Sequence, residues 1–254
     1  MDLANRVYIV TGASSGIGAE TAVLLAEHGA SVAINYGRNK EGAEDTARRC
    51  GEAGAEAIVV QGDVARDEDC RRLVDETVAK WGRVDGLVNN AGTTKFISHA
   101  DLEGLSGEDF QHIYGINVVG VFQMTRAAAP HLKAAGNAAV VNVSSVAGVY
   151  GVGSSIAYAA SKGALNTMTI SLARVLGPEV RVNAVCPGLV ETGFWAGQID
   201  EAQRKTIADN YIAKSPLNRF SRPDETARSI LFFILGDPNI TGQVLVSDGG
   251  FNLM

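Results

Sequence analysis

Short apolar segments alternate with helical patterns along the chain, and this alternation constrains the fold more than any other feature of the sequence. Strand–helix alternation is typical of right-handed βαβ units built around a parallel sheet. Helices on both faces of such a sheet explain why its strands are continuously apolar. The strands are expected near 7–10, 31–35, 57–60, 86–88, 138–143, 180–185 and 244–246.

Between these strands, apolar residues recur at helical spacing. An apolar stripe from Cys70 to Trp81 indicates one such helix, and Asp67 is placed to cap its start. The pattern predicts an α/β fold: one doubly wound Rossmann domain over residues 1–254, with a mostly parallel seven-stranded sheet and helices on both faces. The other helices are expected near 17–28, 39–53, 108–133, 156–176 and 224–235.

One long connection interrupts this pattern. Residues 189–223 are polar and aromatic with weak periodicity, and they are too many for a simple link between two elements. Long segments of this kind are often active-site lids. We therefore expect a substrate lid near 189–223.

The charge and the apolar content exclude several classes of partner. The chain has 254 residues and a formal net charge of −6, whereas a protein that grips nucleic acid or an anionic membrane needs a basic face. The first residues do not resemble a signal peptide, and the longest strongly apolar stretch, Ile230–Leu235, is too short to span a bilayer. Neither the three cysteines nor the four histidines have metal-ligand spacing, so we expect no metal. Three reduced cysteines and no pattern of a signal peptide also lead us to expect a reducing cytoplasm.

The first predicted strand runs directly into TGASSGIG at residues 11–18, and a helix follows at once. Gly12, Gly16 and Gly18 permit a tight turn, close approach of a cofactor and close packing of the helix on the strand. The helix N-terminus then offers free N–H groups and a positive dipole end to a pyrophosphate. The spacing is GxxxGxG instead of the common GxGxxG, and alone it would fit an ordinary glycine-rich turn equally well.

Further motifs follow the glycine loop in a fixed order. NNAG stands at 89–92, a YxxxK pair at 158–162, PG at 187–188 and DGG at 248–250. Together they resemble the short-chain dehydrogenase/reductases over essentially the whole chain. The resemblance implies an oxidoreductase that transfers a hydride between NADP(H) or NAD(H) and a ketone, an aldehyde or a secondary alcohol. It also implies a catalytic tetrad, which is Asn117, Ser145, Tyr158 and Lys162.

The tetrad makes physical sense. Tyr158 and Lys162 are four residues apart and share one helix face. A nearby ammonium is expected to lower the pKa of the tyrosine from about 10, so that the phenol can serve as general acid or base. Ser145 would stabilise charge on the substrate oxygen. Ser144 is its rival, but the offset of thirteen residues to the tyrosine matches the family at Ser145. By resemblance, Lys162 holds the nicotinamide ribose and Asn117 holds a relay water.

The type of nicotinamide depends on the end of the second strand. Residues 35–38 carry no carboxylate for a ribose 2′-hydroxyl, and Arg38 could pair with a 2′-phosphate. NADP(H) is therefore preferred. NAD(H) stays possible, because Ser15 stands where many NADP-preferring relatives carry a basic residue and because Arg38 also fits a solvated loop charge. The resemblance places Asp63 at the adenine edge, Asn90 and Ala91 along the adenosine ribose, and Thr192 at the carboxamide. The residues expected at the cofactor are Gly12, Ser14, Ser15, Gly16, Ile17, Gly18, Tyr36, Arg38, Asp63, Val64, Asn90, Ala91, Gly92, Tyr158, Lys162, Pro187, Gly188, Val190 and Thr192.

The substrate pocket is expected to draw on residues 93–97, residues 148–155 and the lid. The lid aromatics Phe194, Trp195 and Tyr211 indicate a partly apolar substrate, although the same residues would also fit simple packing of the lid.

By motif, the chain resembles ketoacyl reductases that act on acyl-carrier-protein substrates. Those enzymes place basic residues beside the active-site entrance, where they attract an acidic carrier. Here the corresponding segments 131–138 and 176–180 offer Lys133 and the acidic Glu179. We therefore expect a free small carbonyl or alcohol substrate. A carrier-bound 3-ketoacyl chain is the alternative, and an inactive nucleotide-binding sensor is a remote one. Four basic residues could change this balance if folding brings them to the entrance, namely Arg181, Lys214, Arg219 and Arg222.

The helix 156–176 carries two charges, Lys162 and Arg174, and is otherwise rich in small and apolar residues. The outer helix of a single domain should show a polar face. The composition therefore predicts a homo-oligomer, and the resemblance implies a homotetramer.

Overall fold

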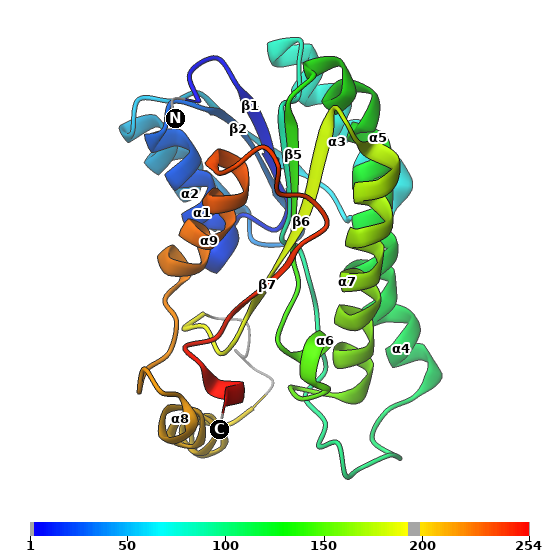
Figure 1. Ribbon diagram of the computed structural model, residues 1–254, viewed down its shortest axis with the longest axis vertical. Helices are drawn as coiled ribbons and strands as arrows, with labels where there is room; N and C mark the ends of the chain where they lie inside the picture. The colour runs from blue at the N-terminus through cyan, green and yellow to red at the C-terminus, as the bar shows by residue number, and fades with distance from the viewer. Residues whose placement is uncertain (1–2, 193–198, 254) are drawn as a thin grey trace.

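The computed structural model describes residues 3–192 and 199–253, and these build a seven-stranded sheet with helices on both faces (Figure 1). The strand order is β3-β2-β1-β4-β5-β6-β7, and each pair of neighbours runs parallel. The order reverses between β1 and β4, as in a doubly wound Rossmann fold, so the predicted fold class is confirmed. The strands are β1 Val7–Val10, β2 Ser31–Tyr36, β3 Ala57–Gln61, β4 Gly86–Asn89, β5 Ala138–Val143, β6 Val180–Pro187 and β7 Val244–Ser247.

Two apolar layers explain the continuously apolar strands. Val10 faces the layer formed with α1, α2 and α9, whereas its neighbour Ile9 faces the layer formed with α3, α5 and α7. All three cysteines are unpaired and buried. In the described part of the chain, no helix is long and apolar enough to cross a membrane. The helices are α1 Gly16–Glu27, α2 Lys40–Glu52, α3 Asp67–Trp81, α4 Gly107–Tyr114, α5 Val121–Ala135, α6 Ala147–Tyr150, α7 Ile156–Leu176, α8 Glu201–Lys214 and α9 Pro223–Leu235.

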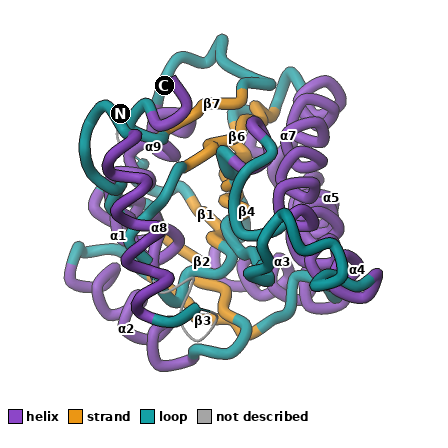
Figure 2. The backbone as a smooth tube through the Cα atoms, turned by 90° about the horizontal axis from the view of Figure 1, so that it is seen from below, coloured by secondary structure: helices purple, strands orange, loops and turns teal. Residues whose placement is uncertain are grey.

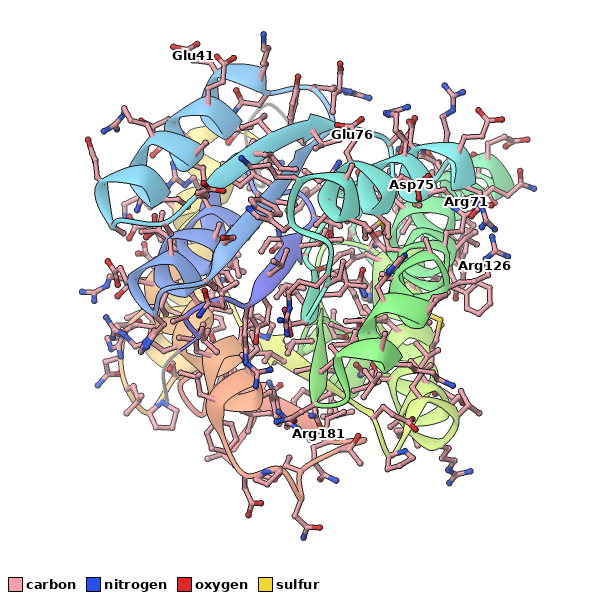
Figure 3. The ribbon with its side chains drawn as sticks, turned by 90° about the horizontal axis from the view of Figure 1, so that it is seen from above. Glu41, Arg71, Asp75, Glu76, Arg126 and Arg181 are labelled. Atoms are coloured by element: carbon pink, nitrogen blue, oxygen red, sulfur yellow. The ribbon has the colours of Figure 1, made fainter. Side chains whose placement is uncertain are left out.

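The start of α3 differs from the prediction. Arg66 is the N-cap residue and makes no side-chain cap hydrogen bond, while Asp67 is the first residue inside the helix. The Asp67 carboxylate instead pairs with Arg71, at 2.8 Å, and with Arg126 of α5, at 2.6 Å. Figure 3 shows these two arginines close together on the outer side of α3 and α5. A carboxylate in the first turn still favours the positive end of the helix, so Asp67 stabilises α3 without capping it.

The segment predicted to be a substrate lid, residues 189–223, contains a helix that the sequence analysis did not predict. Asp200 caps α8, and Gln203 completes a capping box with it. Most side chains of α8 are exposed and polar, with Tyr211 buried, so the helical period was hidden. Phe194 and Trp195, the other predicted lid aromatics, lie outside the described residues.

Polar side chains hold together the amino-terminal edge of the sheet, where the strands begin. Asp85 is fully buried before β4, accepts a hydrogen bond from Val7 N at 2.9 Å and pairs with Arg83 at 2.6 Å. Arg181 at the start of β6 donates to Phe233 O at 2.7 Å and to two further carbonyls at and beyond the end of α9. Figure 3, which views this edge, shows Arg181 between the strands and α9.

Candidate active site

A cavity of about 1450 Å³ lies at the opposite, carboxyl-terminal edge of the sheet, which Figure 2 views face on. Residues after β1 and after β4 both line it, so it sits where the strand order reverses. Open parallel sheets bind their ligands at this point. The volume exceeds the roughly 300–1,000 Å³ of an ordinary ligand pocket, so a dinucleotide and a small substrate fit together.

The glycine loop packs against the NNAG segment. Gly12 has a φ of +62°, and a Cβ on it would lie 2.8 Å from the Cα of Ala91. A Cβ on Gly18 would overlap the side-chain amide of Asn90, which donates to Gly12 O at 3.0 Å. Gly16 also has a positive φ, of +57°. The three glycines are therefore required by a left-handed backbone and by close approach.

The start of α1 suits an anion. Its N-cap residue Ser15 has an extended backbone, its side chain makes no cap hydrogen bond, and the first turn contains no acidic residue. Such an end presents N–H groups and a positive dipole to a phosphate. These features, together with the size of the cavity, fit a dinucleotide pyrophosphate.

Most of the residues predicted at the cofactor line this cavity. Three do not: the Ser14 carbonyl accepts from the Asn39 amide at 3.4 Å, Gly18 packs behind the loop, and Tyr36 is buried in the core. Those that line it are Gly12, Ser15, Gly16, Ile17, Arg38, Asp63, Val64, Asn90, Ala91, Gly92, Tyr158, Lys162, Pro187, Gly188, Val190 and Thr192.

Asn35 is a residue of this region that the sequence analysis missed. Its side chain accepts from Gly12 N at 3.3 Å and donates to Gly62 O at 3.0 Å. It therefore joins the glycine loop to the segment after β3. A buried asparagine in an otherwise apolar strand was the available signal, because a buried amide needs partners.

Tyr158 and Lys162 enter the cavity from the first turns of α7. Ser155 caps this helix by accepting from Tyr158 N at 3.3 Å, which fixes the turn that carries the phenol. Lys162 is 4% exposed, its Nζ lies 5.7 Å from the centre of the Tyr158 ring, and it donates to Val143 O at 2.8 Å. The buried ammonium thus has a main-chain partner at the end of β5.

Ser144 and Ser145 differ in what they contact. Ser144 Oγ donates to Lys162 O at 3.2 Å and is committed to the backbone of α7. Ser145 makes a side-chain hydrogen bond with Tyr158, and its Oγ accepts from Ala147 N at 3.1 Å. The geometry therefore favours Ser145 over Ser144 as the partner of the phenol.

Burial dominates the titration of this pair. It raises the pKa of Tyr158 to about 12, with the Ser145 hydrogen bond acting in the opposite direction. It lowers the pKa of Lys162 to about 8. The expected lowering of the tyrosine pKa by Lys162 is therefore wrong for the protein alone, because desolvation of the phenol raises the pKa and Ser145, not Lys162, acts against it. A phenol that keeps its proton suits the acid of a carbonyl reduction.

Asn117 lies behind the cavity wall. It belongs to a π-helix, Gly115–Gly120, inserted between α4 and α5, where the sequence had predicted one continuous helical region. Its side chain accepts from Thr93 N at 2.8 Å and donates to Ser161 Oγ at 3.0 Å. A Cβ on Gly92 would lie 3.3 Å from Asn117 Oδ1 and 3.7 Å from Lys162 Nζ. Single π-turns are frequent at functional sites, and this one brings Asn117 close to Lys162.

The substrate end of the cavity combines predicted and unpredicted walls. Lys95, within the predicted segment, points away and pairs with Asp109 at 2.7 Å. The 3₁₀-helix Phe251–Leu253 contributes Phe251, whose ring stacks on Tyr211 at 4.5 Å. His112 also lines the cavity. From the predicted segments, the lining residues are Thr93, Phe96, Ile97, Val152, Gly153, Ser154 and Tyr211, and from α8 the further ones are Ala202, Gln203, Thr206, Ile207, Asn210 and Lys214.

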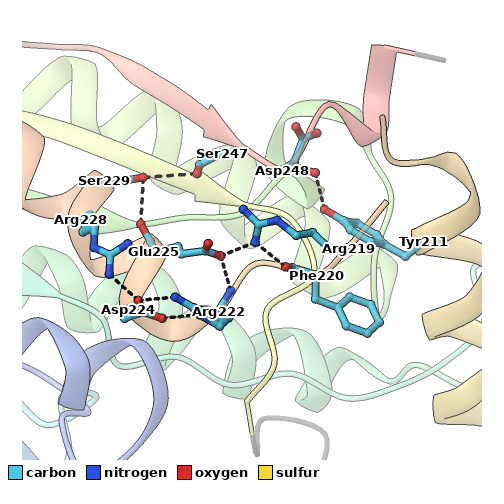
Figure 4. Close-up of polar contacts among 10 residues, drawn as sticks. All are labelled: Tyr211, Arg219, Phe220, Arg222, Asp224, Glu225, Arg228, Ser229, Ser247 and Asp248. Carbon is cyan, nitrogen blue, oxygen red and sulfur yellow. Dashed lines mark hydrogen bonds and ion pairs between the residues drawn. The ribbon is translucent and has the colours of Figure 1, made fainter. Parts of the chain in front are cut away.

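The four basic residues that could have made the cavity entrance positive lie in different places and have different partners. Arg181 lies at the far edge of the sheet. Arg219 pairs with Glu225 at 2.6 Å, and Arg222 pairs with Asp224 at 3.0 Å, as Figure 4 shows. Of the four, Lys214 lines the cavity.

A Rossmann sheet with a dinucleotide-sized cavity, lined by a half-buried tyrosine beside a buried lysine, defines the class of protein, which is an oxidoreductase. A family model described as enoyl-(acyl carrier protein) reductase matches residues 12–252. A Streptomyces violaceoruber protein, named as a ketoacyl reductase of the granaticin polyketide synthase, is 46% identical and aligns with 98% of this chain and 96% of its own.

Two further comparisons agree with this class. The cis-4-hydroxycyclohexanecarboxylate dehydrogenase of Sinomonas cyclohexanicum is 39% identical, over 98% of this chain and 97% of its own. A crystal structure from Burkholderia xenovorans, described as a short-chain dehydrogenase/reductase, has a TM-score of 0.91 and 42% identity, and covers 98% of each chain. The chain belongs to the short-chain dehydrogenase/reductase family. It is an enzyme of CH–OH and C=O groups, and its family uses NAD(H) or NADP(H).

Proposed function

We propose that this enzyme interconverts a ketone or aldehyde and its alcohol with NADP(H), using Tyr158 as the general acid and base. The observation that supports this most directly is that Tyr158, Ser145 and Lys162 line the same cavity as the glycine loop, with Lys162 Nζ 5.7 Å from the centre of the Tyr158 ring. The bound nicotinamide would supply or accept the hydride. In reduction, Tyr158 gives its proton to the carbonyl oxygen, and Ser145 donates a hydrogen bond to the same oxygen.

The other two members of the tetrad assist Tyr158. Lys162 would turn from Val143 O to the nicotinamide ribose, and its ammonium would then stabilise the phenolate left after proton transfer. Asn117 Oδ1 accepts one hydrogen bond, from Thr93 N, and a carbonyl oxygen can accept two. The second acceptor position suits a water that returns a proton towards Lys162.

The rest of the cavity would hold the cofactor. The start of α1 receives the pyrophosphate, Asp63 and Val64 meet the adenine, and Thr192 meets the carboxamide. Arg38 is exposed at the cavity, and no acidic side chain among residues 3–192 and 199–253 pairs with it. Its guanidinium is therefore available to a 2′-phosphate.

We predict that NADPH binds at least tenfold more tightly than NADH. Arg38→Ala should weaken NADPH binding by about tenfold or more, because a charge-assisted hydrogen bond contributes roughly 1.5–3 kcal/mol, and should leave NADH binding unchanged. Fluorescence titration of both cofactors measures this. Arg66→Ala, which removes an arginine that pairs with Glu68 outside the cavity, is the matched control. Tighter binding of NADH by the unmodified enzyme would contradict the preference.

For the substrate, we propose a free small carbonyl compound or secondary alcohol. An acidic carrier would meet a protein of net charge −6, and of the four candidate basic residues Lys214 alone lines the cavity. A carrier-bound 3-ketoacyl chain remains the second candidate, because the related Streptomyces violaceoruber protein is named as a ketoacyl reductase. A carrier advantage of tenfold or more in kcat/KM, shrinking as salt rises, would favour that candidate.

We also propose a homotetramer, with α5 and α7 at one interface. Ile170 and Val175 of α7 are 40% and 66% exposed, and Phe122 of α5 is 44% exposed. Exposed large apolar side chains on surface helices favour association. Sedimentation velocity at micromolar concentration should show an oligomer, and Val175→Glu should shift it towards smaller species. A monomer under these conditions would contradict the proposal.

A further inference from the structure

We propose that Lys214 recognises an anionic group of the substrate, so that the carbonyl compound carries a carboxylate or a phosphate. This inference rests on the proposed reaction and narrows its substrate class. It starts from the lid helix α8, which lies below the sheet beside the end of the chain in Figure 1.

One face of α8 looks into the cavity. Gln203, Ile207, Asn210 and Lys214 all line it, and their spacing of three or four residues places them on the same side of the helix. Lys214 is in the last turn, so its side chain stands at the end of this face nearest the C-terminal segment 248–251.

The backbone around Lys214 is held in place. The buried Tyr211 donates its hydroxyl hydrogen to Asp248 O at 2.6 Å, as drawn in Figure 4, and the buried Ser215 donates to Gly249 O at 3.0 Å. These two bonds flank Lys214 on either side. A lysine on a fixed turn loses little freedom of the main chain when it binds a ligand.

The other charges of α8 are already paired or distant. Lys205 bonds Asp209 at 2.7 Å, and Arg204 lies 3.9 Å from Glu201. Asp200 caps the opposite end of the helix, about 21 Å away for fourteen residues at a rise of about 1.5 Å. No acidic side chain within residues 3–192 and 199–253 lies within 4.0 Å of Lys214.

The remaining cations of the cavity have other roles. Arg38 is the residue proposed above to bind the 2′-phosphate of the cofactor, and Lys162 is bonded to Val143 O next to Tyr158. Among the described lysine and arginine side chains that line the cavity, Lys214 is therefore the one available to the part of the substrate that extends from the reacting carbonyl under α8. The neighbouring walls combine the apolar Ile207 and the stacked ring of Phe251 with the polar Asn210, so the group between the carbonyl and the anion meets both kinds of surface.

The same anion could come from two sources. It could be the carboxylate of a free keto acid or the phosphate of a phosphopantetheine thioester. Two pairs of probes separate them: a keto acid with its methyl ester, and 3-oxobutyryl pantetheine with its 4′-phosphate. The keto acid is chosen as the fastest member of a panel of alkyl, aryl and cyclic keto acids with NADPH.

We expect the unmodified enzyme to favour the charged member of one pair by at least tenfold in kcat/KM, mainly through KM, and the preference to shrink with salt. Lys214→Gln should abolish that preference and leave the uncharged member within twofold. If the keto acid and its methyl ester show the effect, the anion is a carboxylate; if the two pantetheine thioesters show it, the anion is the 4′-phosphate. Lys205→Gln, on the same helix but paired with Asp209 outside the cavity, should change neither.

Three results would overturn the inference: no charge preference in the unmodified enzyme, equal losses for charged and neutral probes in Lys214→Gln, or weaker NADPH binding in that variant. The last would mean that Lys214 serves the cofactor. Failure of the proposed reaction looks different, because Tyr158→Phe would then keep its activity towards every probe.

Discussion

Replacing Tyr158 with phenylalanine is expected to lower kcat by about 10²–10⁴, the usual range for the loss of a general acid or base. The ring, its packing and the cap at Ser155 stay, since Ser155 Oγ bonds the main-chain N–H of residue 158. What disappears is the hydroxyl that bonds Ser145. Steady-state reduction of the best ketone with NADPH measures the loss, and cofactor titration should give an unchanged Kd.

Tyr150→Phe is the matched control for that experiment. Tyr150 is 46% exposed at the end of α6 and does not line the cavity, so removal of its hydroxyl should leave kcat within twofold. A hydride isotope effect establishes that chemistry limits the rate. If Tyr158→Phe then keeps more than a tenth of the original turnover, the phenol is not the acid.

Replacing Lys162 with methionine is expected to remove activity and at the same time to stabilise the cofactor-free protein. Burial lowers the pKa of this lysine from 10.5 to about 8. A shift of that size means that burying the ammonium destabilises the native protein by about 3 kcal/mol at pH 7, and methionine removes this cost. The variant also loses the hydrogen bond to Val143 O, which destabilises it by about 1 kcal/mol. We expect a net gain of about 1–2 kcal/mol in the free energy of unfolding, measured by urea denaturation.

The same linkage fixes the sign of the pH dependence. Between about pH 8 and 10.5, the unfolded chain still binds a proton at Lys162 that the native protein has lost, so native stability rises with pH relative to the variant. The pKa of Tyr158, raised to about 12, acts in the opposite direction above pH 10, and the measurement therefore ends at pH 10. Burial also raises the pKa of the neighbouring Cys186, which both proteins share. Parallel stability curves for the two proteins would contradict a costly buried ammonium.

Much of the fold could be predicted because its elements have strong periodic signals. The strand 138–143 and the helix 156–176 have the predicted bounds, since one is a continuous apolar run and the other is a long segment of small and apolar residues. The helix α8 was missed because its stability comes from caps and from one buried tyrosine, instead of an apolar stripe. The role of Asp67 was misread, because capping depends on a backbone conformation that residue type alone does not determine.

The candidate site, too, could be predicted only in part from the sequence. Motif order predicted that Ser145, Tyr158 and Lys162 lie together; the helix period brings Tyr158 and Lys162 to one face of α7, and Ser145 follows the end of β5. It could not predict that Phe251 from the end of the chain forms a wall of the cavity, because that contact depends on the path of α8. The raised pKa of Tyr158 was also beyond reach, since desolvation depends on everything packed around the ring.

The clusters around Asp85 and Arg181 have a consequence for how this protein can change. They anchor strands and α9 at the amino-terminal edge of the sheet, whereas the candidate catalytic residues lie at the carboxyl-terminal edge. Substitutions in α8 are therefore expected to alter which substrate is converted without weakening the contacts that hold the strands together. A variant library aimed at new substrates should keep the amino-terminal edge constant and vary the residues of α8, the turn before α7 and the segment around Phe251.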